Sequence, residues 1–356
     1  MSDAVAVEAL SLTLGAFRLK KIDFALARGE ILIILGPNGS GKSVTLETIA
    51  GFHRPDAGRI VVAGRDVTAL PPERRKIGFV VQNFGLFPHL SVAQNVAIGE
   101  RGHHAGRVHN KDLLSYFGID HLANRAPADL SAGEKQRVAL ARALASAPDL
   151  FMFDEPFSAL DAETRTQLRA ELKTFLRALA IPAIFVTHDH DEAMALGDTV
   201  IVLRDGGVMQ RGSVAEIFNK PSNSFVARFV GVENILPARV VARLSNLLTC
   251  AVDRQIVYAT PPAGVLPEGA AKLAIRAEHI TVSPVPAALG AARTRNTLEC
   301  RVKALRVLGP LATVEVECGF LLKAYLLSPQ VQAMGLAEGN LVEVQIPPDA
   351  IHVMAE

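Results

Sequence analysis

The sequence predicts an α/β domain followed by a smaller all-β domain of the barrel type. Up to about residue 230, short apolar runs typical of buried strands alternate with stretches of helical periodicity. Beyond residue 237 helical stretches are few, and Pro- and Gly-containing turns separate short β-rich runs. The length of 356 residues also exceeds what one average domain needs. We therefore expect one domain at residues 1–232 and a second at 233–356.

The elements of the first domain follow from local patterns. Residues 5–30 alternate loosely between apolar and polar side chains, which predicts antiparallel strands with a turn at 14–17. Further strands are predicted at 30–35, 58–64, 76–81, 150–153, 183–187 and 199–203. Helices are predicted at 43–50, 132–147 and 163–179, with a small helical insertion at about 84–131. Asp205-Gly206 marks a tight hairpin turn after the last strand.

The composition argues against several classes of protein. Hydrophobic residues make up 49% of the chain, which is enough for sizeable cores. The formal net charge of +1 gives no sign of a nucleic-acid-binding surface, so we expect no nucleic acid partner. The N-terminus lacks the basic start and apolar core of a signal peptide, and no apolar run approaches the ~18 residues that span a bilayer. A role at a membrane would therefore require a partner protein that crosses it.

Cysteine is sparse. The three cysteines, Cys250, Cys300 and Cys318, all fall in the last third of the chain and form no CxxC pair. This pattern predicts neither a disulfide framework nor a zinc site, and it favours a reducing compartment.

The clearest chemical motif is the run Gly36-Pro37-Asn38-Gly39-Ser40-Gly41-Lys42-Ser43. It fits the phosphate-binding loop GxxxxGKS, and it lies between a predicted buried strand and a predicted helix that Gly51 would close. The glycines let the backbone curl so that successive N–H groups point at phosphate oxygens, and the helix N-terminus adds its positive end. We expect Lys42 to contact the β/γ-phosphates and the Ser43 hydroxyl to be a ligand of Mg²⁺.

Two carboxylates, Asp154 and Glu155, follow the apolar run at 150–153. A carboxylate at the carboxyl end of a parallel strand beside a phosphate loop can hold Mg²⁺ through water, and a second can polarise an attacking water. Taken alone, however, an acidic pair after an apolar strand is more often a solvated strand end. Further motifs decide between these alternatives.

The signature loop of the ATP-binding-cassette (ABC) ATPases, commonly LSGGQ, resembles Leu130-Ser131-Ala132-Gly133-Glu134. Ala132 and Glu134 depart from the common pattern. The family's other motifs appear in the family's order: a Q-loop at Gln82, the Walker B run Asp154-Glu155-Pro156, the D-loop Ser158-Ala159-Leu160-Asp161 and a switch histidine at His188. The resemblance covers about residues 5–230 and implies a P-loop NTPase fold, an ABC cassette with a helical subdomain.

The resemblance implies that this domain binds and hydrolyses ATP with Mg²⁺ as cofactor. Glu155 would be the general base, and His188 would hydrogen-bond the γ-phosphate. Gln82 would contact Mg²⁺ or the attacking water. Asp154 would complete the Mg²⁺ site beside Ser43.

The signature loop implies a second copy of the chain. Ser131 and the amide of Gly133 would bind the γ-phosphate of ATP held by the other subunit, in a loop that includes Glu134. On the phosphate-loop side, Val44 follows Ser43 and belongs to the expected nucleotide-binding set. Because a signature loop lies far from its own phosphate loop in this family, the expected active unit is a head-to-tail dimer with ATP sandwiched at two composite sites.

The residue that stacks on adenine has two candidates. The family uses an aromatic from the loop between its first strands, and counting back from the phosphate loop places Leu14 there, with Phe17 three residues on. Either Phe17 stacks on the base, or adenine rests on an aliphatic surface at Leu14. A plain core position for Phe17 is equally compatible with the sequence.

Two regions resemble bacterial importers of the maltose, sulfate, iron, polyamine and molybdate type. The first consists of residues 71–78 together with 87–95. The second is Ile275-Arg276-Ala277-Glu278-His279-Ile280, which is similar to the IRPEHI run of the accessory OB-type (TOBE) domain in these importers. This implies transmembrane permease subunits as partners, a periplasmic or lipoprotein solute-binding protein acting indirectly, and a peripheral position on the cytoplasmic face of the cell membrane. The helical insertion near 84–92 would receive the permease. A soluble cassette protein is the alternative class, but the chain has neither a second cassette nor a long coiled-coil insertion.

The cargo that the resemblance favours is molybdate or tungstate. Val44, where many relatives have Thr, and residues 70–75 resemble members that import these oxyanions. Arg295-Asn296-Thr297-Leu298 resembles the SARN motif of their oxyanion-binding domain, with Arg293 where that motif has Ser. Arginines at 293, 295 and 301 could cradle a tetrahedral dianion near turn amides, or they could form a solvated basic edge. Ferric iron, sulfate, polyamine and sugar stay open as alternatives.

Overall fold

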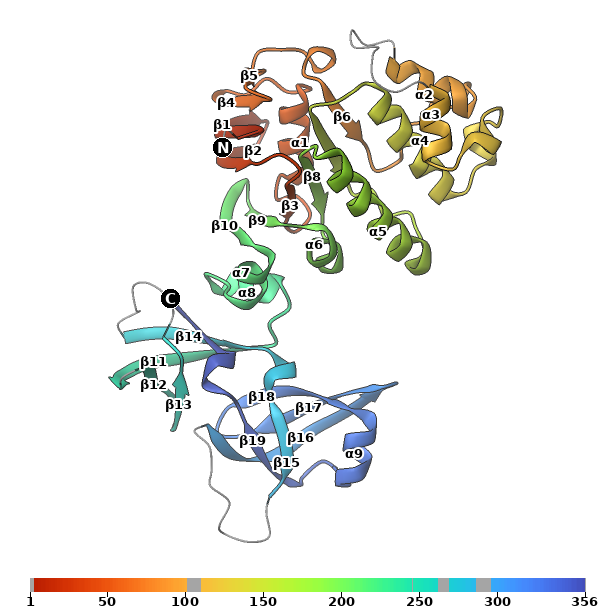
Figure 1. The fold of residues 1–356 in the computed structure, drawn as a ribbon. Coiled ribbons are helices and arrows are strands. Elements are labelled where there is room, and N and C mark those ends of the chain that lie inside the picture. Colours follow the sequence, from red (N-terminus) through yellow and green to blue (C-terminus); the bar gives the residue numbers. More distant parts are fainter. Residues whose placement is uncertain (1–2, 101–109, 245, 262–268, 286–295, 356) are drawn as a thin grey trace. The chain divides into compact units, whose positions relative to one another are not determined.

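The computed structural model describes residues 3–100, 110–244, 246–261, 269–285 and 296–355 (Figure 1). The chain forms two compact units, residues 1–214 and 215–356. Helix α8 (Ser224–Phe229) and most of α7 (Val214–Asn219) thus fall in the second unit, whereas the sequence analysis places its boundary after residue 232. Within the described residues, every helix is too short or too polar to cross a membrane.

A six-stranded sheet forms the centre of the first unit. Its strand order is β10-β9-β3-β8-β7-β6, and all neighbours are parallel except β10 and β9. The strands are β3 (Ile31–Leu35), β6 (Ile77–Val80), β7 (Leu150–Asp154), β8 (Ala183–Thr187), β9 (Thr199–Arg204) and β10 (Gly207–Ser213). Every residue of β3 and β8 is buried, as expected for strands covered on both faces. The predicted α/β sheet is confirmed.

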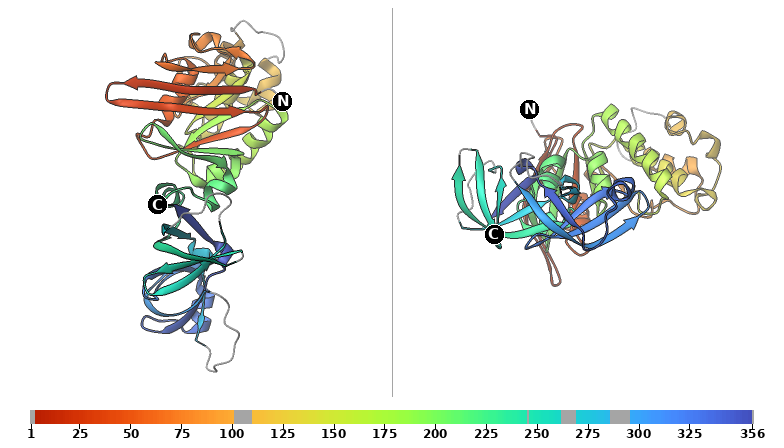
Figure 2. Two further views of the ribbon diagram at one scale, coloured as in Figure 1. Left: turned by 90° about the vertical axis from the view of Figure 1, so that its left-hand side faces the viewer. Right: turned by 90° about the horizontal axis from the view of Figure 1, so that it is seen from below.

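A second, antiparallel sheet of the first unit has the order β2-β1-β4-β5. Its strands are β1 (Val5–Leu14), β2 (Phe17–Leu26), β4 (Ala57–Val62) and β5 (Arg65–Asp66). Figure 2 shows β1 and β2 lying side by side as a long hairpin. One core cluster joins this sheet, the six-stranded sheet and helix α1 (Lys42–Ala50), with contributions such as Leu10, Ile34 and Ile49.

The remaining helices of the first unit are α2 (Val92–Glu100), α3 (Asn110–Tyr116), α4 (Ala132–Ala145), α5 (Ala162–Leu179) and α6 (His190–Leu196). Helices α4 and α5 begin within two residues of their predicted starts. Helix α6 was not predicted from the sequence because it is short and follows β8 closely. Its start carries a local signal, since the Asp189 side chain accepts hydrogen bonds from the backbone N–H groups of Asp191 and Glu192.

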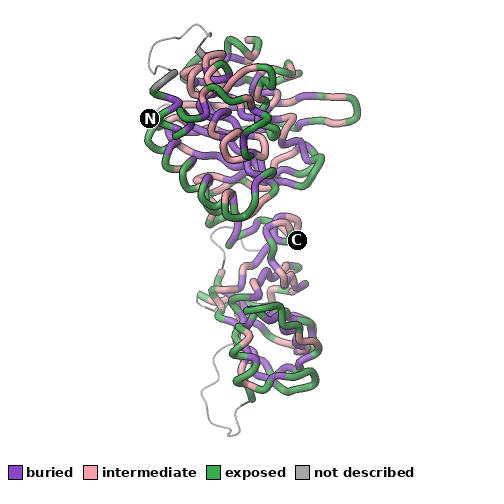
Figure 3. The backbone as a smooth tube through the Cα atoms, turned by 90° about the vertical axis from the view of Figure 1, so that its right-hand side faces the viewer, coloured by how far each residue is buried: buried purple, intermediate pink, exposed green. Residues whose placement is uncertain are grey.

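The second unit is strand-rich, as predicted, and consists of two five-stranded antiparallel sheets. The first has the order β13-β12-β11-β14-β20 and the second β15-β19-β16-β17-β18. The first sheet contains β11 (Asn234–Leu244), β12 (Leu247–Val252), β13 (Gln255–Ala259), β14 (Gly269–Ile275) and β20 (Ile351–Ala355). The second contains β15 (Thr281–Pro284), β16 (Thr297–Leu308), β17 (Leu311–Glu317), β18 (Leu321–Leu327) and β19 (Leu341–Gln345), and α9 (Ser328–Met334) follows β18. Figure 3 shows buried and exposed residues alternating along these strands, whose inner faces share one core.

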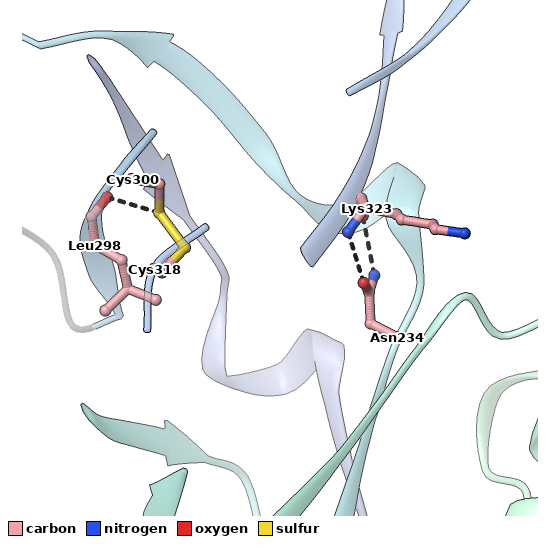
Figure 4. The surroundings of a disulfide bond; sticks show 5 residues. All are labelled: Asn234, Leu298, Cys300, Cys318 and Lys323. Carbon is pink, nitrogen blue, oxygen red and sulfur yellow. Dashed lines mark hydrogen bonds between the residues drawn. A yellow bond between two sulfur atoms is a disulfide. The ribbon is translucent and has the colours of Figure 1, made fainter. Parts of the chain in front are cut away.

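Two buried asparagines connect the sheets of the second unit. Asn234 on β11 donates to the Lys323 carbonyl at 2.9 Å and accepts from the Lys323 N–H at 2.7 Å (Figure 4). Asn296 accepts from the Tyr258 N–H at 2.6 Å and donates to the carbonyls of Tyr258 and Ile346 at 2.7 and 3.0 Å. Asn234 joins β11 of the first sheet to β18 of the second, and Asn296 joins β13 of the first sheet to the residue that follows β19 of the second. Both side chains therefore help to hold the two sheets together.

Cys300 and Cys318 form a disulfide, so the expectation of no disulfide was wrong (Figure 4). The two residues are 18 apart in sequence, but β16 and β17 pair with Arg301 opposite Glu317. The next positions outward on the two strands are therefore 300 and 318, and their Cα atoms lie 4.5 Å apart. A hairpin brings the cysteines together without any short sequence motif. Cys250 is buried and free.

Candidate functional site

The phosphate loop connects β3 to α1 and curls tightly at its glycines. Gly41 caps α1 with φ +103°, a left-handed conformation that L side chains rarely adopt. A Cβ atom at Gly41 would lie 2.5 Å from Cζ of Phe17 and 2.9 Å from Cδ2 of Leu19. The backbone conformation therefore favours glycine here, and any side chain would also have to displace the tip of the Phe17 ring.

Lys42 is held inside this curl. Its Nζ donates hydrogen bonds to the carbonyls of Gly36 at 2.9 Å and Pro37 at 3.2 Å, and the residue is 6% exposed. Burial lowers the pKa of Lys42, while the nearby charges of Glu155 and Asp154 act in the opposite direction. The ammonium group therefore lies inside the curl of the loop, close to the carboxylates at the carboxyl end of β7.

Ser43 and Asp154 lie side by side. The Ser43 hydroxyl donates to Oδ1 of Asp154 at 3.2 Å, which joins the first turn of α1 to the carboxyl end of β7. Burial is the main cause that raises the pKa of Asp154, so a nearby cation would relieve the cost of its charge. A hydroxyl and a carboxylate are the hard oxygen donors that Mg²⁺ prefers. The residues present thus fit a Mg²⁺ ion.

Glu155 and His188 meet at the ends of neighbouring strands β7 and β8. Nδ1 of His188 lies 3.1 Å from Oε1 of Glu155, and the Glu155 N–H donates to the Val186 carbonyl at 2.9 Å. Glu155 has a φ of +47°, an unusual value for a residue other than glycine. Its side chain is 19% exposed and that of His188 is 59% exposed. Both groups are therefore accessible at this edge of the sheet.

Ser158 extends the arrangement, and the sequence analysis gave it no role of its own. Its hydroxyl donates to the Glu155 carbonyl at 2.9 Å and accepts from Nε2 of Gln82 at 3.4 Å. The structure thus connects Gln82, Ser158, Glu155 and His188 in one chain of contacts. The spacing of Ser158, three residues after Glu155 in a turn, is the signal that could have identified it.

The signature residues form a capping box at the start of α4. Glu134 accepts hydrogen bonds from the N–H and the hydroxyl of Ser131 at 2.7 and 2.8 Å, and the Glu134 N–H donates back to the Ser131 hydroxyl at 3.3 Å. The hydrogen bond from the Ser131 hydroxyl is the main cause that lowers the pKa of Glu134. Gly133 packs against α5, since a Cβ there would lie 3.4 Å from Cγ2 of Thr164. Among the described residues, the hydrogen bonds of this turn do not reach the phosphate loop of the same chain.

Both adenine candidates lie at the tip of the first hairpin. Leu14 and Phe17 are paired residues of β1 and β2, and both are half-buried. The structure places the Phe17 ring against Gly41, next to the phosphate loop. Val44, in the first turn of α1, is also half-buried and packs with both residues against the core.

Arg75 binds the C-terminal end of α1, the helix that follows the phosphate loop, and this role was not predicted from the sequence. The side chain is buried, and its Nη1 donates to the carbonyls of Thr48 and Ile49 at 3.0 and 2.8 Å. These carbonyls belong to the last turn of α1, and the one of Thr48 also accepts from the N–H of the capping residue Gly51 at 3.2 Å. Arg75 thus fixes the end of the helix that begins at the phosphate loop.

The residues that suggested an oxyanion site in the second unit are only partly described. Arg293 and Arg295 lie outside the described residues. Asn296 is 5% exposed and its amide is committed to backbone groups, as given above. Arg301 donates to the Gly339 carbonyl at 2.9 Å. Asn296 therefore has a structural role here.

Lys42 lies in a tightly curled loop between the buried parallel strand β3 and helix α1, and the carboxylates of Asp154 and Glu155 lie at the same edge of the sheet. This arrangement defines a P-loop nucleotide hydrolase. Residues 19–158 match the ABC transporter family, and residues 273–354 match the TOBE domain. The chain belongs to the ABC transporter family, as an ATP-hydrolysing import subunit with a TOBE domain.

Several relatives span nearly the whole chain. The molybdate/tungstate import ATP-binding protein WtpC of Pyrococcus abyssi is 39% identical over 352 residues, 98% of this chain and 99% of that protein. The sulfate/thiosulfate import ATP-binding protein CysA 2 of Chromobacterium violaceum is 38% identical over 360 residues, 98% of this chain and 94% of that protein. A spermidine/putrescine import ATP-binding protein of Nitratidesulfovibrio vulgaris is 44% identical over 67% of this chain and 66% of its own length.

Among solved structures, the cassette is similar to a dimeric ATP-binding cassette in a post-hydrolysis state bound to ADP and phosphate. The TM-score is 0.52 at 30% sequence identity, and the match covers 59% of this chain and 98% of that chain. The predicted family and fold class are thus confirmed.

Proposed function

We propose that this import ATPase energises the uptake of molybdate or tungstate. The observation that carries the proposal is the 39% identity to a molybdate/tungstate import protein over 98% of the chain. The sulfate/thiosulfate relative, which also spans 98% of the chain, is named for another tetrahedral oxyanion. A ferric iron relative from Brucella abortus aligns with 75% of the chain and the polyamine relative with 67%. Similarity that extends through the second unit thus favours an oxyanion over a metal ion or an amine.

The chain's own residues divide the chemistry of ATP hydrolysis. Lys42 binds the β/γ-phosphates within the loop, and Phe17 or Leu14 supports the adenine ring. Glu155 accepts a proton from the attacking water as general base. Ser43, Asp154 and Gln82 would hold Mg²⁺, which would supply positive charge that balances the charge on the phosphates.

The active unit is a head-to-tail dimer. In the capping box the Ser131 hydroxyl accepts from the Glu134 N–H, whereas the N–H groups of Ala132 and Gly133 in the same first turn have no partner within the helix and point toward its N-terminus, where an anion is favoured. ATP bound to one copy would supply that anion to the other copy. The dimeric state of the similar cassette that holds ADP and phosphate supports this arrangement.

The assembly also includes proteins outside this chain. Transmembrane permease subunits would bind the helical insertion, and a periplasmic or lipoprotein solute-binding protein would deliver the cargo to them. The ATPase would then lie at the cytoplasmic face of the cell membrane as a peripheral subunit. The names of the relatives, which are ATP-binding proteins of import systems, support this placement.

Uptake measured with the permease reconstituted beside this chain tests the cargo. Molybdate or tungstate should accumulate in an ATP-dependent manner, and sulfate should compete weakly. The same assembly carrying Glu155→Gln should accumulate neither, which controls for leakage. Accumulation of sulfate, ferric iron or polyamine without any response to molybdate or tungstate would overturn the proposed cargo while leaving the ATPase assignment intact.

A further inference from the structure

Two arginines of α5, one helical turn apart, contact the segments that follow β7 and β8. Nη2 of Arg165 donates to the Leu160 carbonyl at 2.8 Å, and Nη1 of the same side chain lies 3.7 Å from Oδ2 of Asp189. Nη2 of Arg169 donates to that same oxygen at 2.7 Å. Leu160 belongs to the D-loop, and Asp189 lies with the switch histidine in the two-residue connection between β8 and α6, here called the histidine turn. The arginines thus connect the D-loop to the histidine turn.

The two carboxylate oxygens of Asp189 have different partners. Oδ1 accepts hydrogen bonds from the N–H groups of Asp191 and Glu192 and so caps α6, whereas Oδ2 faces the two arginines. The Asp189 N–H in turn donates to the Thr187 hydroxyl at 3.0 Å. The backbone on either side of His188 is therefore anchored, at Thr187 in β8 and at Asp189 by the cap and the ion pairs.

The ion pairs around Arg169 are largely buried. Its side chain is 11% exposed, and its Nη2 also lies 3.1 Å from Oε1 of Glu192, whose side chain is 5% exposed. The Arg169 guanidinium lies 5.8 Å from the centroid of the Phe157 ring, which follows Glu155 closely in the chain. Charges removed from solvent in this way are screened little by salt. The two carboxylates balance the two arginines, so replacing one carboxylate leaves a cation without its partner.

Stability alone does not account for this cluster. The Nε atoms of Arg165 and Arg169 are buried, and neither has a hydrogen-bond partner among the described residues. An unpaired buried donor destabilises a fold, and a buried ion pair contributes little net stability compared with apolar side chains. What the cluster does provide is a defined geometry between two loops.

The contact between His188 and Glu155 depends on that geometry. Nδ1 of the imidazole and Oε1 of the carboxylate lie 3.1 Å apart. The His188 side chain is 59% exposed, so packing does not fix it and its position follows from that of its backbone. On the other side, the Ser158 N–H donates to the Glu155 carbonyl at 3.2 Å at the start of the D-loop, which Arg165 binds. The arginine cluster thus anchors the backbone of both partners.

We propose that Asp189 is a positioning residue for ATP hydrolysis. Through Arg165 and Arg169 it holds the histidine turn against the D-loop, so that His188 stays in contact with Glu155. Asp189 contacts neither the nucleotide nor the attacking water in this role and acts through His188. The inference rests on the roles proposed above for Glu155 and His188.

Asp189→Asn in the full-length protein tests the proposal. Asparagine has the same shape and can still cap α6, but it carries no charge for the two arginines. We expect kcat for ATP hydrolysis to fall about tenfold, because a small displacement of reacting groups lowers the rate steeply, whereas KM and Kd for ATP should change by less than about twofold. Asp191→Asn removes an exposed carboxylate from the first turn of the same helix and should leave kcat unchanged.

A second variant keeps the test decisive if Asp189→Asn does not fold. Arg165→Lys retains the charge of a side chain that is 30% exposed, but a single ammonium cannot replace a guanidinium that contacts both the Leu160 carbonyl and Asp189. It should also lower kcat with KM unchanged. The double variant should be no slower than Asp189→Asn alone, because both changes break the same link.

The outcomes separate the inference from the mechanism on which it rests. Unchanged kcat for Asp189→Asn or Arg165→Lys, a change confined to KM, or losses that multiply in the double variant would each overturn the positioning role while leaving the assignment of His188 intact. His188→Ala that hydrolyses ATP at the parent rate would overturn the role proposed for His188, and the inference with it.

Discussion

The Nδ1 atom of His188 lies 3.1 Å from a carboxylate oxygen of Glu155. An ionised carboxylate can only accept hydrogen bonds, so Nδ1 carries the proton in this contact. His188 thus orients Glu155 through Nδ1, and in the proposed mechanism Nε2 is the nitrogen left to contact the γ-phosphate.

The first prediction concerns Glu155. Glu155→Gln should preserve ATP binding but lower the hydrolysis rate by about 10²–10⁴-fold, because the amide cannot accept the proton from water. With ATP and Mg²⁺ the variant should persist as a dimer in size-exclusion chromatography. Lys42→Ala is the contrasting variant and should lose nucleotide binding itself. Hydrolysis by Glu155→Gln at the parent rate would show that the assigned base is wrong.

The second prediction concerns the adenine ring. If Phe17 stacks on it, Phe17→Ala should weaken ATP binding by an amount equivalent to ~1–3 kcal/mol, the scale of base stacking on aromatic side chains. Turnover at saturating ATP should change little. Phe52→Ala removes an exposed phenyl ring of the same unit and should leave affinity unchanged. Calorimetric titration with ATP distinguishes the cases, and an effect of Leu14→Ala alone would assign the aliphatic alternative.

The third prediction concerns Asp154. Because burial raises its pKa, the folded state disfavours the ionised carboxylate, and this penalty develops as the pH rises above the ordinary pKa of aspartate. Asp154→Asn should therefore raise the melting temperature at pH 7 in the absence of Mg²⁺ and nucleotide, and the gain should shrink at acidic pH. The same variant should lose Mg²⁺-dependent ATP hydrolysis. Thermal melts across pH check the first part.

Asp205→Asn provides the control for that experiment. Asp205 has a side chain that is 80% exposed and lies in a tight turn where asparagine is equally suitable. Its replacement should not produce the pH-dependent gain. A lower melting temperature for Asp154→Asn at pH 7 would mean that contacts of the carboxylate outweigh its burial cost.

The strands and the phosphate loop could be predicted from the sequence because both depend on neighbouring residues. The apolar run of β3 and the glycines that follow it determine their conformation locally. The capping box of Ser131 and Glu134 also fits a local S-x-x-E pattern, although it was not predicted from the sequence. The buried position of Arg75 was not, because its partners in α1 come from residues 26 and 27 positions earlier in the chain.

Contacts set by strand register were beyond sequence reasoning. Asn296 was assigned by resemblance to an anion-binding motif, but its amide pairs with Tyr258 and Ile346, which are 38 and 50 residues away. The pairing of Cys300 with Cys318 likewise depends on the alignment of β16 with β17. The sequence spacing of the two cysteines does not indicate how β16 and β17 are aligned.

The last prediction concerns this disulfide. Closing a loop between residues 18 apart removes chain entropy from the unfolded state, and the expected stabilisation is about 3 kcal/mol. Reductant should therefore lower the melting temperature of the wild-type protein. The double variant Cys300→Ala and Cys318→Ala should melt at a comparably reduced temperature and should not respond to reductant. Cys250→Ala, which removes the free thiol, should keep the full response to reductant. Mass spectrometry after alkylation without reductant should find one reactive thiol on unfolding, and three would show that the bond is absent from the protein in solution.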